Sequence, residues 1–324
     1  MKIALDAMGG ECAPADTVVG AITAAKDYNI DIMLVGRRAV IEPELKRHHY
    51  DLPIIDASQV VELGDTPTEV MRDKRDSSIA VGIGLVKSGE VDAFVSAGNT
   101  GAVMTAATLL LKRIEGIERP ALSILVSMPW HSILILDVGA NVNCKPGYLV
   151  QFAQMGSVYM ERVFGIENPK VGLLSNGEEE GKGNTLVHET HQLLKDAGLN
   201  FVGNVEGNHL PNNSADVIVT DGFTGNVVIK IGEAVGEMAV RSIKLAIAQK
   251  PHLKVLALMI KPAIRSAFNF VDYTEYGGAP LLGVNGNVII SHGRSNARAI
   301  RNALLIAKRA AEQDLVEAIR KGVN

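Results

Sequence analysis

Short apolar runs alternate with segments of helical period along most of this chain, and this alternation limits the folds that it can adopt. Apolar runs at residues 3–5, 32–35 and 54–55 are separated by helix-period stretches that begin near residues 15 and 37. Strands that alternate with helices are typical of βαβ units, whose strands lie parallel in one sheet. The sequence therefore predicts a three-layer α/β/α fold with a mostly parallel sheet.

The alternation is interrupted in two places. Residues 121–128 and 133–139 are two strand-like runs separated by four residues, which predicts a hairpin or an antiparallel pair inside the sheet. After a long predicted helix at 227–248, residues 250–271 form a helical insertion rich in apolar and basic residues. Because no repeat, low-complexity tract or linker divides the chain, we expect residues 1–324 to form a single α/β domain that includes this insertion.

Composition excludes several classes of protein. The chain has 324 residues, of which 47% are hydrophobic, so it can bury a large core and is not expected to be disordered. Its net charge of -4 gives no general reason to expect nucleic-acid binding. The first residues read as a strand and a turn rather than a signal peptide, and no apolar run approaches the roughly 20 residues that span a bilayer. We therefore expect a cytoplasmic protein whose membrane contacts are peripheral.

Five loops that follow predicted strands combine glycine with Asp, Asn, Ser or Thr. In a doubly wound sheet such loops meet at a crevice beside the strand ends, so we expect all five to line one ligand site. Each loop taken alone also has the composition of an ordinary turn. The loops are DAMGGE at 6–11, SAGNTG at 96–101, DVGAN at 137–141, SNGEEEGKGN at 175–184 and DGFTGN at 221–226.

The fourth of these loops predicts an anion site. Gly181 and Gly183 allow the backbone to approach a ligand, and Lys182 adds a mobile positive charge. Residues 185–197 have helical spacing, so the free N–H groups of a helix N-terminus would also face the ligand. Phosphate is the expected anion. The alternative is a plain connection between a strand and a helix.

The residue types in the five loops narrow the chemistry. The eight histidines are scattered, and the two cysteines fit neither a disulfide framework nor a CxxC site, so we expect no metal and no cofactor. A P-loop is excluded because the glycine spacing is one residue short, and neither a G-x-G-x-x-G nor a G-x-S-x-G motif is present. Direct transfer between two bound substrates is therefore favoured over a covalent acyl-enzyme. The loops and the helix after them supply the amides Asn99, Asn141, Asn184 and Asn226, the carboxylates Asp6, Asp137, Glu178 and Asp221, and the lysines Lys182 and Lys230.

Nine segments spread over the whole chain resemble one known family, the bacterial phosphate acyltransferases. These enzymes transfer the acyl group of acyl-acyl carrier protein to phosphate, which makes acyl phosphate at the start of phospholipid synthesis. One departure is Glu11, where the family more often has Asp. The segments are ALDAMGGECAP (4–14), FVSAGNTGAVM (94–104), ERPAL (118–122), LDVGANVNCKP (136–146), GLLSNGEEEGKGN (172–184), FVGNVEGN (201–208), DVIVTDGFTGNVVIK (216–230), YGGAPLLG (276–283) and SHGRSN (291–296).

This resemblance implies a fold similar to phosphotransacetylases and to isocitrate and isopropylmalate dehydrogenases. It also implies a homodimer in the cytoplasm that associates peripherally with the membrane, and a membrane glycerol-3-phosphate acyltransferase that consumes the product. Two alternatives stay open. One is an oxidoreductase of the dehydrogenase-like fold, with a metal bound by Asp137 and Asp221. The other is a noncatalytic dimeric scaffold that docks carrier protein on membranes.

Phosphorolysis of a thioester assigns roles to the loop residues. Asn226 or Asn184 would donate to the oxyanion, Asp221 would orient phosphate or carry a proton, and Lys230, one turn beyond Asn226, would neutralise charge. The predicted catalytic residues are Lys182, Asp221, Asn226 and Lys230. The predicted substrate-binding residues are Asn99, Thr100, Gly101, Asn141, Glu178, Gly181, Gly183 and Asn184.

Residues 238–271 carry several lysines and arginines and no Asp or Glu, which makes a basic segment in an acidic chain. Apolar residues interleave with the cations. The pattern predicts a surface element that contacts anionic lipid or the acidic carrier protein, and the alternative is a buried helix pair or a dimer interface. The predicted contact residues are Arg241, Lys244, Lys254, Leu256, Leu258, Ile260, Lys261 and Arg265.

Overall fold

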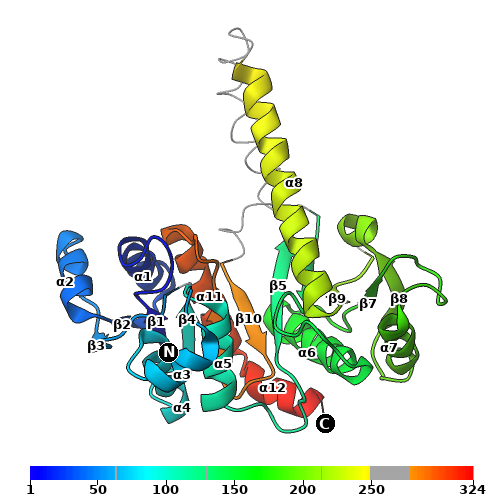
Figure 1. Ribbon diagram of the computed structural model, residues 1–324, viewed down its shortest axis with the longest axis horizontal. Helices are drawn as coiled ribbons and strands as arrows, with labels where there is room; N and C mark the ends of the chain where they lie inside the picture. The colour runs from blue at the N-terminus through cyan, green and yellow to red at the C-terminus, as the bar shows by residue number, and fades with distance from the viewer. Residues whose placement is uncertain (63, 129, 213, 249–276, 324) are drawn as a thin grey trace.

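The computed structural model describes residues 1–62, 64–128, 130–212, 214–248 and 277–323. In these ranges eleven strands form one sheet in the order β3-β2-β1-β4-β11-β10-β5-β6-β9-β7-β8 (Figure 1). The strands are β1 (Lys2–Asp6), β2 (Asp31–Gly36), β3 (Ile54–Asp56), β4 (Ala93–Ser96), β5 (Ala121–Ser127), β6 (Ser132–Leu136), β7 (Val171–Ser175), β8 (Phe201–Glu206), β9 (Val217–Val219), β10 (Ala279–Leu282) and β11 (Asn287–Ile290).

Helices cover both faces of the sheet, so the predicted α/β/α layering is confirmed. On the β1–β4 half, α1 and α11 bury one face and α4 and α5 bury the other. On the β6–β9 half, α6 and α12 pack on one face around Leu134 and Leu136, and the first turns of α8 contact the other face. The helices are α1 (Ala15–Tyr28), α2 (Arg38–Arg47), α3 (Pro67–Asp73), α4 (Ser78–Ser88), α5 (Thr100–Leu110), α6 (Pro146–Phe164), α7 (Thr185–Lys195), α8 (Gly222–Ala248), α11 (Ala297–Glu312) and α12 (Leu315–Gly322), with a 3-10 turn η1 (Gly207–Asn212).

The sheet is parallel within each half and reverses between them. Strands β3, β2, β1, β4 and β11 pair in parallel, and so do β6, β9, β7 and β8. Between the halves, β11–β10, β10–β5 and β5–β6 are antiparallel. The pair β5–β6 is the antiparallel pair that the sequence predicts at 121–139. Three reversals leave the two halves running in opposite directions.

This reversal corrects one expectation about the loops. The loops after β1 and β4 leave one edge of the sheet, whereas the loops after β6, β7 and β9 leave the opposite edge. The five loops therefore do not share a single crevice at the strand ends. Residues from some of them still meet, because α5 and α8 carry them onto a face of the sheet.

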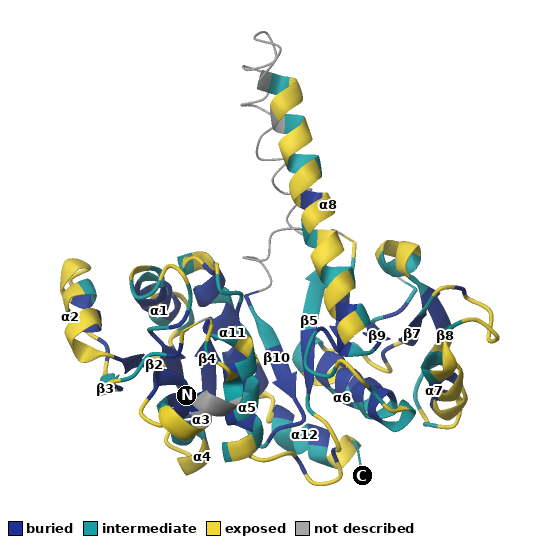
Figure 2. Ribbon diagram, in the orientation of Figure 1, coloured by how far each residue is buried: buried dark blue, intermediate teal, exposed yellow. Residues whose placement is uncertain are grey.

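Helix α8 has two parts with different surroundings. Its first turns pack on the sheet, and the rest extends away from the body of the molecule (Figure 1) with most of its residues exposed (Figure 2). An apolar stripe runs along the outside of the helix, with Ile231 58% and Met238 62% exposed. None of the helices in the described ranges is long and apolar enough to cross a membrane.

Candidate functional site

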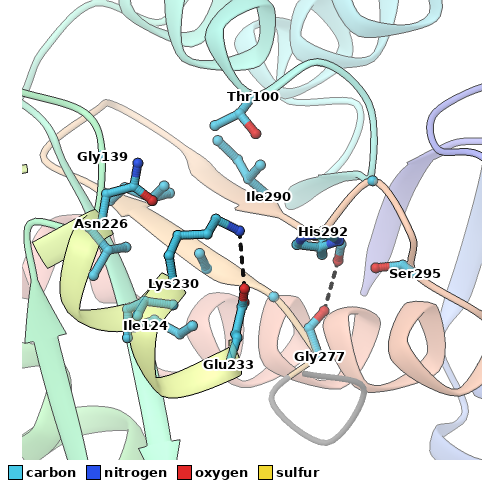
Figure 3. A pocket seen from close by; sticks show the side chains of 17 residues that line it. Thr100, Ile124, Gly139, Asn226, Lys230, Glu233, Gly277, Ile290, His292 and Ser295 are labelled. Atoms are coloured by element: carbon cyan, nitrogen blue, oxygen red, sulfur yellow. Dashed lines mark hydrogen bonds and ion pairs between the residues drawn. The ribbon is translucent and has the colours of Figure 1, made fainter. Parts of the chain in front are cut away.

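A cavity of about 360 Å³ lies on the face of the sheet between the start of α5 and the first turns of α8 (Figure 3). Leu122 and Ile124 of β5 and Ile290 of β11 supply apolar surface. Polar groups surround this surface, and they come from loops that are far apart in the sequence. They belong to Thr100, Asn226, Lys230, Glu233, Ser291, His292 and Ser295.

Asp221 sets the start of α8 and thereby places two of the predicted residues. Its carboxylate accepts the backbone N–H of Thr224 at 2.9 Å and the Thr224 hydroxyl at 2.7 Å. A carboxylate in this position caps the free N–H groups of a helix N-terminus. Asn226 and Lys230 are four residues apart on this helix, so both face the cavity. In the structure Asp221 acts as a cap and does not line the cavity.

Asp137 is buried and organises the turn after β6. Its carboxylate accepts backbone N–H groups from Leu122, Gly139, Ala140 and Asn141 at 2.7–3.1 Å, and the Asn141 side-chain amide at 2.9 Å. Burial raises the pKa of Asp137, and these donors oppose the shift. The Asn141 amide also donates to the carbonyl of Pro120 at 2.8 Å. Asp137 and Asn141 thus hold Gly139 at the cavity wall without lining it themselves.

The charged groups of the cavity come from α8 and from the loop after β11. The Lys230 ammonium donates to the Glu233 carboxylate at 3.1 Å. The His292 Nδ1 accepts the backbone N–H of Arg294 at 3.1 Å, so the neutral ring carries its proton on Nε2. Burial, and then the charge of Lys230, lower the pKa of His292. A cation and a neutral N–H donor therefore share one cavity, which suits an anionic ligand.

His292 and Glu233 were not among the predicted site residues. The signal for His292 was present, because SHG at 291–293 follows the apolar run at 288–290 in the manner of the other polar loops. A single histidine has no metal-ligand spacing, so the sequence pattern alone does not single out His292. Nothing in the sequence around Glu233 indicates that it pairs with Lys230 beyond their separation of three residues.

The turn at 96–101 contributes one residue to the cavity. Asn99 caps α5, since its side-chain oxygen accepts the N–H of Ala102 at 3.0 Å, and its amide donates to the carbonyl of Asp65 at 3.1 Å. Gly101 lies against Pro67. Thr100, the first residue of α5, lines the cavity. Among the three residues predicted here, the structure therefore brings only Thr100 to the described cavity wall.

The glycine loop at 175–184 lies elsewhere. Within the described chain none of its residues lines the cavity, because β7 is separated from β6 by β9. Glu178 pairs with the Nδ1 of His209 at 2.5 Å, and Asn184 caps α7 by accepting the N–H of Val187 at 3.0 Å. Lys182 is exposed, as is Gly181. The roles of Lys182, Glu178, Gly181, Gly183 and Asn184 stay predictions.

Of the eight residues predicted to contact membrane or partner, two lie in the described part of the chain. Arg241 is exposed on α8, and Lys244 lies in the same helix. The others lie outside the described residues: Lys254, Leu256, Leu258, Ile260, Lys261 and Arg265.

Three further observations bear on the chemistry. In the part of the chain that the structure describes, no group of three or more His, Cys, Asp or Glu side chains is placed to hold a metal ion. Burial raises the pKa of Cys144 to about 11, so its thiol is protonated at neutral pH. The carboxylates of Asp137 and Asp221, which an oxidoreductase would use as metal ligands, accept backbone N–H groups instead.

Comparison with solved structures shows the fold. A phosphotransacetylase from Streptococcus pyogenes superposes with a TM-score of 0.67 at 18% identity and covers 96% of this chain and 94% of its own. A 4-hydroxythreonine-4-phosphate dehydrogenase from Klebsiella pneumoniae superposes with a TM-score of 0.56 at 11% identity and covers 96% of this chain and 99% of its own. The predicted fold class is confirmed.

Comparison with sequences shows the family. A family model described as "Fatty acid synthesis protein" matches residues 1–318. The phosphate acyltransferase of Dictyoglomus turgidum is 50% identical over 100% of this chain and 98% of the relative. That of Geobacter sulfurreducens is 46% identical over 100% of this chain and 92% of the relative. The chain therefore belongs to the phosphate acyltransferase family and is an acyltransferase.

Proposed function

We propose that this enzyme transfers the acyl group of acyl-acyl carrier protein to inorganic phosphate and releases acyl phosphate. The observation that carries the proposal is the make-up of the cavity. Lys230, Asn226 and His292 offer a cation and two N–H donors to an anion, and Ile124 and Ile290 offer apolar surface beside them. Phosphate needs the cation and the N–H donors, and the acyl group of a thioester needs apolar surface, so transfer between them requires both next to each other.

Phosphate would bind between Lys230 and the first turn of α5. Its second ionisation lies near pH 6 to 7, so at neutral pH it needs donors more than it needs a strong base. The Lys230 ammonium supplies charge, and Glu233 holds that ammonium in place at 3.1 Å. Thr100 is the first residue of α5, where free backbone N–H groups and the helix dipole favour an anion.

The reaction would then proceed by direct attack. A phosphate oxygen bonds to the thioester carbonyl carbon, the C–S bond breaks with its electron pair on sulfur, and the phosphate proton passes to that sulfur. Asn226 Nδ2 or His292 Nε2–H would donate to the carbonyl oxygen as it gains negative charge. Loss of one such donor typically costs about 2.7 to 4 kcal/mol of transition-state stabilisation.

The test is to incubate the purified protein with palmitoyl-acyl carrier protein and radiolabelled inorganic phosphate. We expect label in an acid-labile, lipid-soluble product. Binding of phosphate and carrier protein without label transfer would contradict acyl-acyl carrier protein as the donor and acyl phosphate as the product.

Dimer formation and membrane association are also proposals. The outer stripe of α8 includes Phe223, Val227, Ile231, Val235 and Met238, all exposed and spaced by three or four residues, as in helices that pack against a partner helix. This supports a homodimer through α8, which light scattering tests.

Changing Leu256, Leu258 and Ile260 to Ser should abolish binding to anionic vesicles and leave the dimer intact. Loss of the dimer with unchanged vesicle binding would reverse these assignments. Delivery of acyl phosphate to a membrane glycerol-3-phosphate acyltransferase rests on the same vesicle result.

A further inference from the structure

A second cavity, of about 410 Å³, lies beside the first along β5, β6 and α8. We call it the apolar groove. Apart from Glu233 at one end, the described side chains that line it are apolar. Its strands, helix α8 and the turn η1 contribute Ile124, Val126, Ile133, Leu210, Ile229 and Gly232 among others.

The apolar groove continues the first cavity. Ile124, Ile229 and Glu233 line both. Lys230 and His292 line the first cavity and not the second, so the cation and the N–H donors among the described lining residues lie at one end of the combined space. A molecule with one polar end and one long apolar end matches this arrangement.

The groove exists because one sheet face is incompletely covered. Residues alternate between the faces of a strand, so Val126 of β5 and its cross-strand partner Ile133 of β6 point to the same side. Ile133 is buried, whereas Ile124 and Val126 are half-buried. After its first turns α8 leads away from the sheet (Figure 1), so the described helices do not finish covering this surface. Leaving apolar surface in water is unfavourable.

We propose that the apolar groove binds the acyl chain of the donor, with the thioester at the junction between Ile124 and Ile229. This deepens the proposed function and rests on it. The thioester carbonyl then lies where Asn226 and Lys230 can reach it, and the chain extends toward Leu210. Each methylene buried in such a groove strengthens binding by about fourfold, so the length of the groove sets a preference for long chains.

Gly232 allows the groove to be filled without disturbing the core. A Cβ atom added at Gly232 would meet none of the described residues within 4 Å, so Gly232→Phe would place a ring in the groove. Ala234 follows two residues later, which turns it by about 200° around the helix. It is exposed and is absent from both cavity walls. Ala234→Phe is therefore the matched control, and Val126→Phe fills the groove from the opposite side.

The experiment compares kcat/KM for palmitoyl-acyl carrier protein with kcat/KM for the butyryl donor. In Gly232→Phe and in Val126→Phe we expect the long-to-short ratio to fall by at least about tenfold, since several methylenes lose their site. In Ala234→Phe the ratio should match the wild type. Binding of the fluorescent fatty acid cis-parinaric acid gives a second readout that needs no turnover, and we expect it to weaken in the two groove variants alone.

The outcomes separate this inference from the proposed function. If the wild type turns over both donors and both groove variants keep the wild-type ratio, the acyl chain lies elsewhere and the inference is wrong while the function stands. If the wild type turns over neither donor, the proposed function is wrong. In that case, loss of parinaric acid binding in the groove variants would still identify an apolar ligand site, and unchanged binding would overturn the groove as well.

Discussion

Lys230 and Lys182 both belong to polar glycine loops or the helix that follows one, yet the structure surrounds them differently. Lys230 shares a cavity with His292 and is held by Glu233 at 3.1 Å. Lys182 is exposed. A carboxylate of its loop, that of Glu180, forms an ion pair at 2.6 Å with Lys195 on the following helix. The strand before Lys230 is β9, which pairs with β6, and β6 is the strand at which the sheet reverses. Helices α5 and α8, from opposite halves, flank the cavity there. Loop composition is similar in the two regions, and the position of the preceding strand decides which of the two lysines lines the cavity.

The largest expected difference between the two lysines is in kcat/KM. In Lys230→Ala we expect kcat/KM to fall by on the order of a hundredfold, because the phosphate and the developing oxyanion lose a nearby charge. Lys182→Ala is the matched control, and a change within about twofold in kcat and in the KM for phosphate would remove Lys182 from the catalytic machinery. A larger loss at Lys182 than at Lys230 would move the phosphate site to the glycine loop.

A smaller difference between the two regions is expected in the free energy of unfolding when a glycine of each is changed to alanine. A Cβ at Gly225 would overlap the carbonyl oxygen of Asp137, so Gly225→Ala must push α8 away from the turn after β6. We expect a loss of about 1 to 3 kcal/mol in the free energy of unfolding. A Cβ at Gly181 would meet none of the described residues within 4 Å, so Gly181→Ala should change stability by no more than about 0.5 kcal/mol. Urea denaturation measures both. Activity lost in Gly181→Ala with stability unchanged would show that the loop needs close backbone approach to a ligand.

The smallest effect concerns the pKa of His292. We expect NMR titration to place it below the ordinary value of 6.5, because burial and Lys230 disfavour the charged ring. Lys230→Ala should raise this pKa, and Lys182→Ala should leave it unchanged. The folded protein binds fewer protons here than the unfolded chain, so His292 makes stability fall as the pH drops below 6.5. An unchanged pKa in Lys230→Ala would place the two side chains apart in solution.

The fold could be predicted where the signal is local. Alternating apolar runs and helical periods identified β1, α1 and β2, and the short gap at 129–132 identified the pair β5–β6. At the C-terminal end α11 and α12 are separate helices, because Asp314 adopts a positive φ of 47° between them. The order of the strands, and with it the reversal of the sheet, depends on pairing between distant segments that no local pattern records.

The site was harder to predict because the same residue types serve two purposes. Asn99 and Asn184 each precede a helix and accept an N–H from its first turn, which is the usual role of an asparagine in that position. A ligand-binding amide has the same neighbours in sequence. Among the predicted residues that lie in the described part of the chain, only Thr100, Asn226 and Lys230 reach the cavity wall, and the path of α5 and α8 over the sheet places them there.

Helix α8 ties the cavity to the outer surface of the molecule by a fixed angle. Lys230 and Glu233 face the cavity, and Val235 and Met238 lie further along the same rigid rod. Each residue turns an α-helix by about 100° and advances it by about 1.5 Å. Inserting or deleting one residue after Glu233 would leave the cavity untouched and rotate the part of the apolar stripe beyond it, which includes Val235 and Met238, by about 100° relative to the cavity. The helix therefore fixes the angle between the cavity residues and the stripe residues. An insertion or deletion preserves this angle only if it adds or removes whole helical turns.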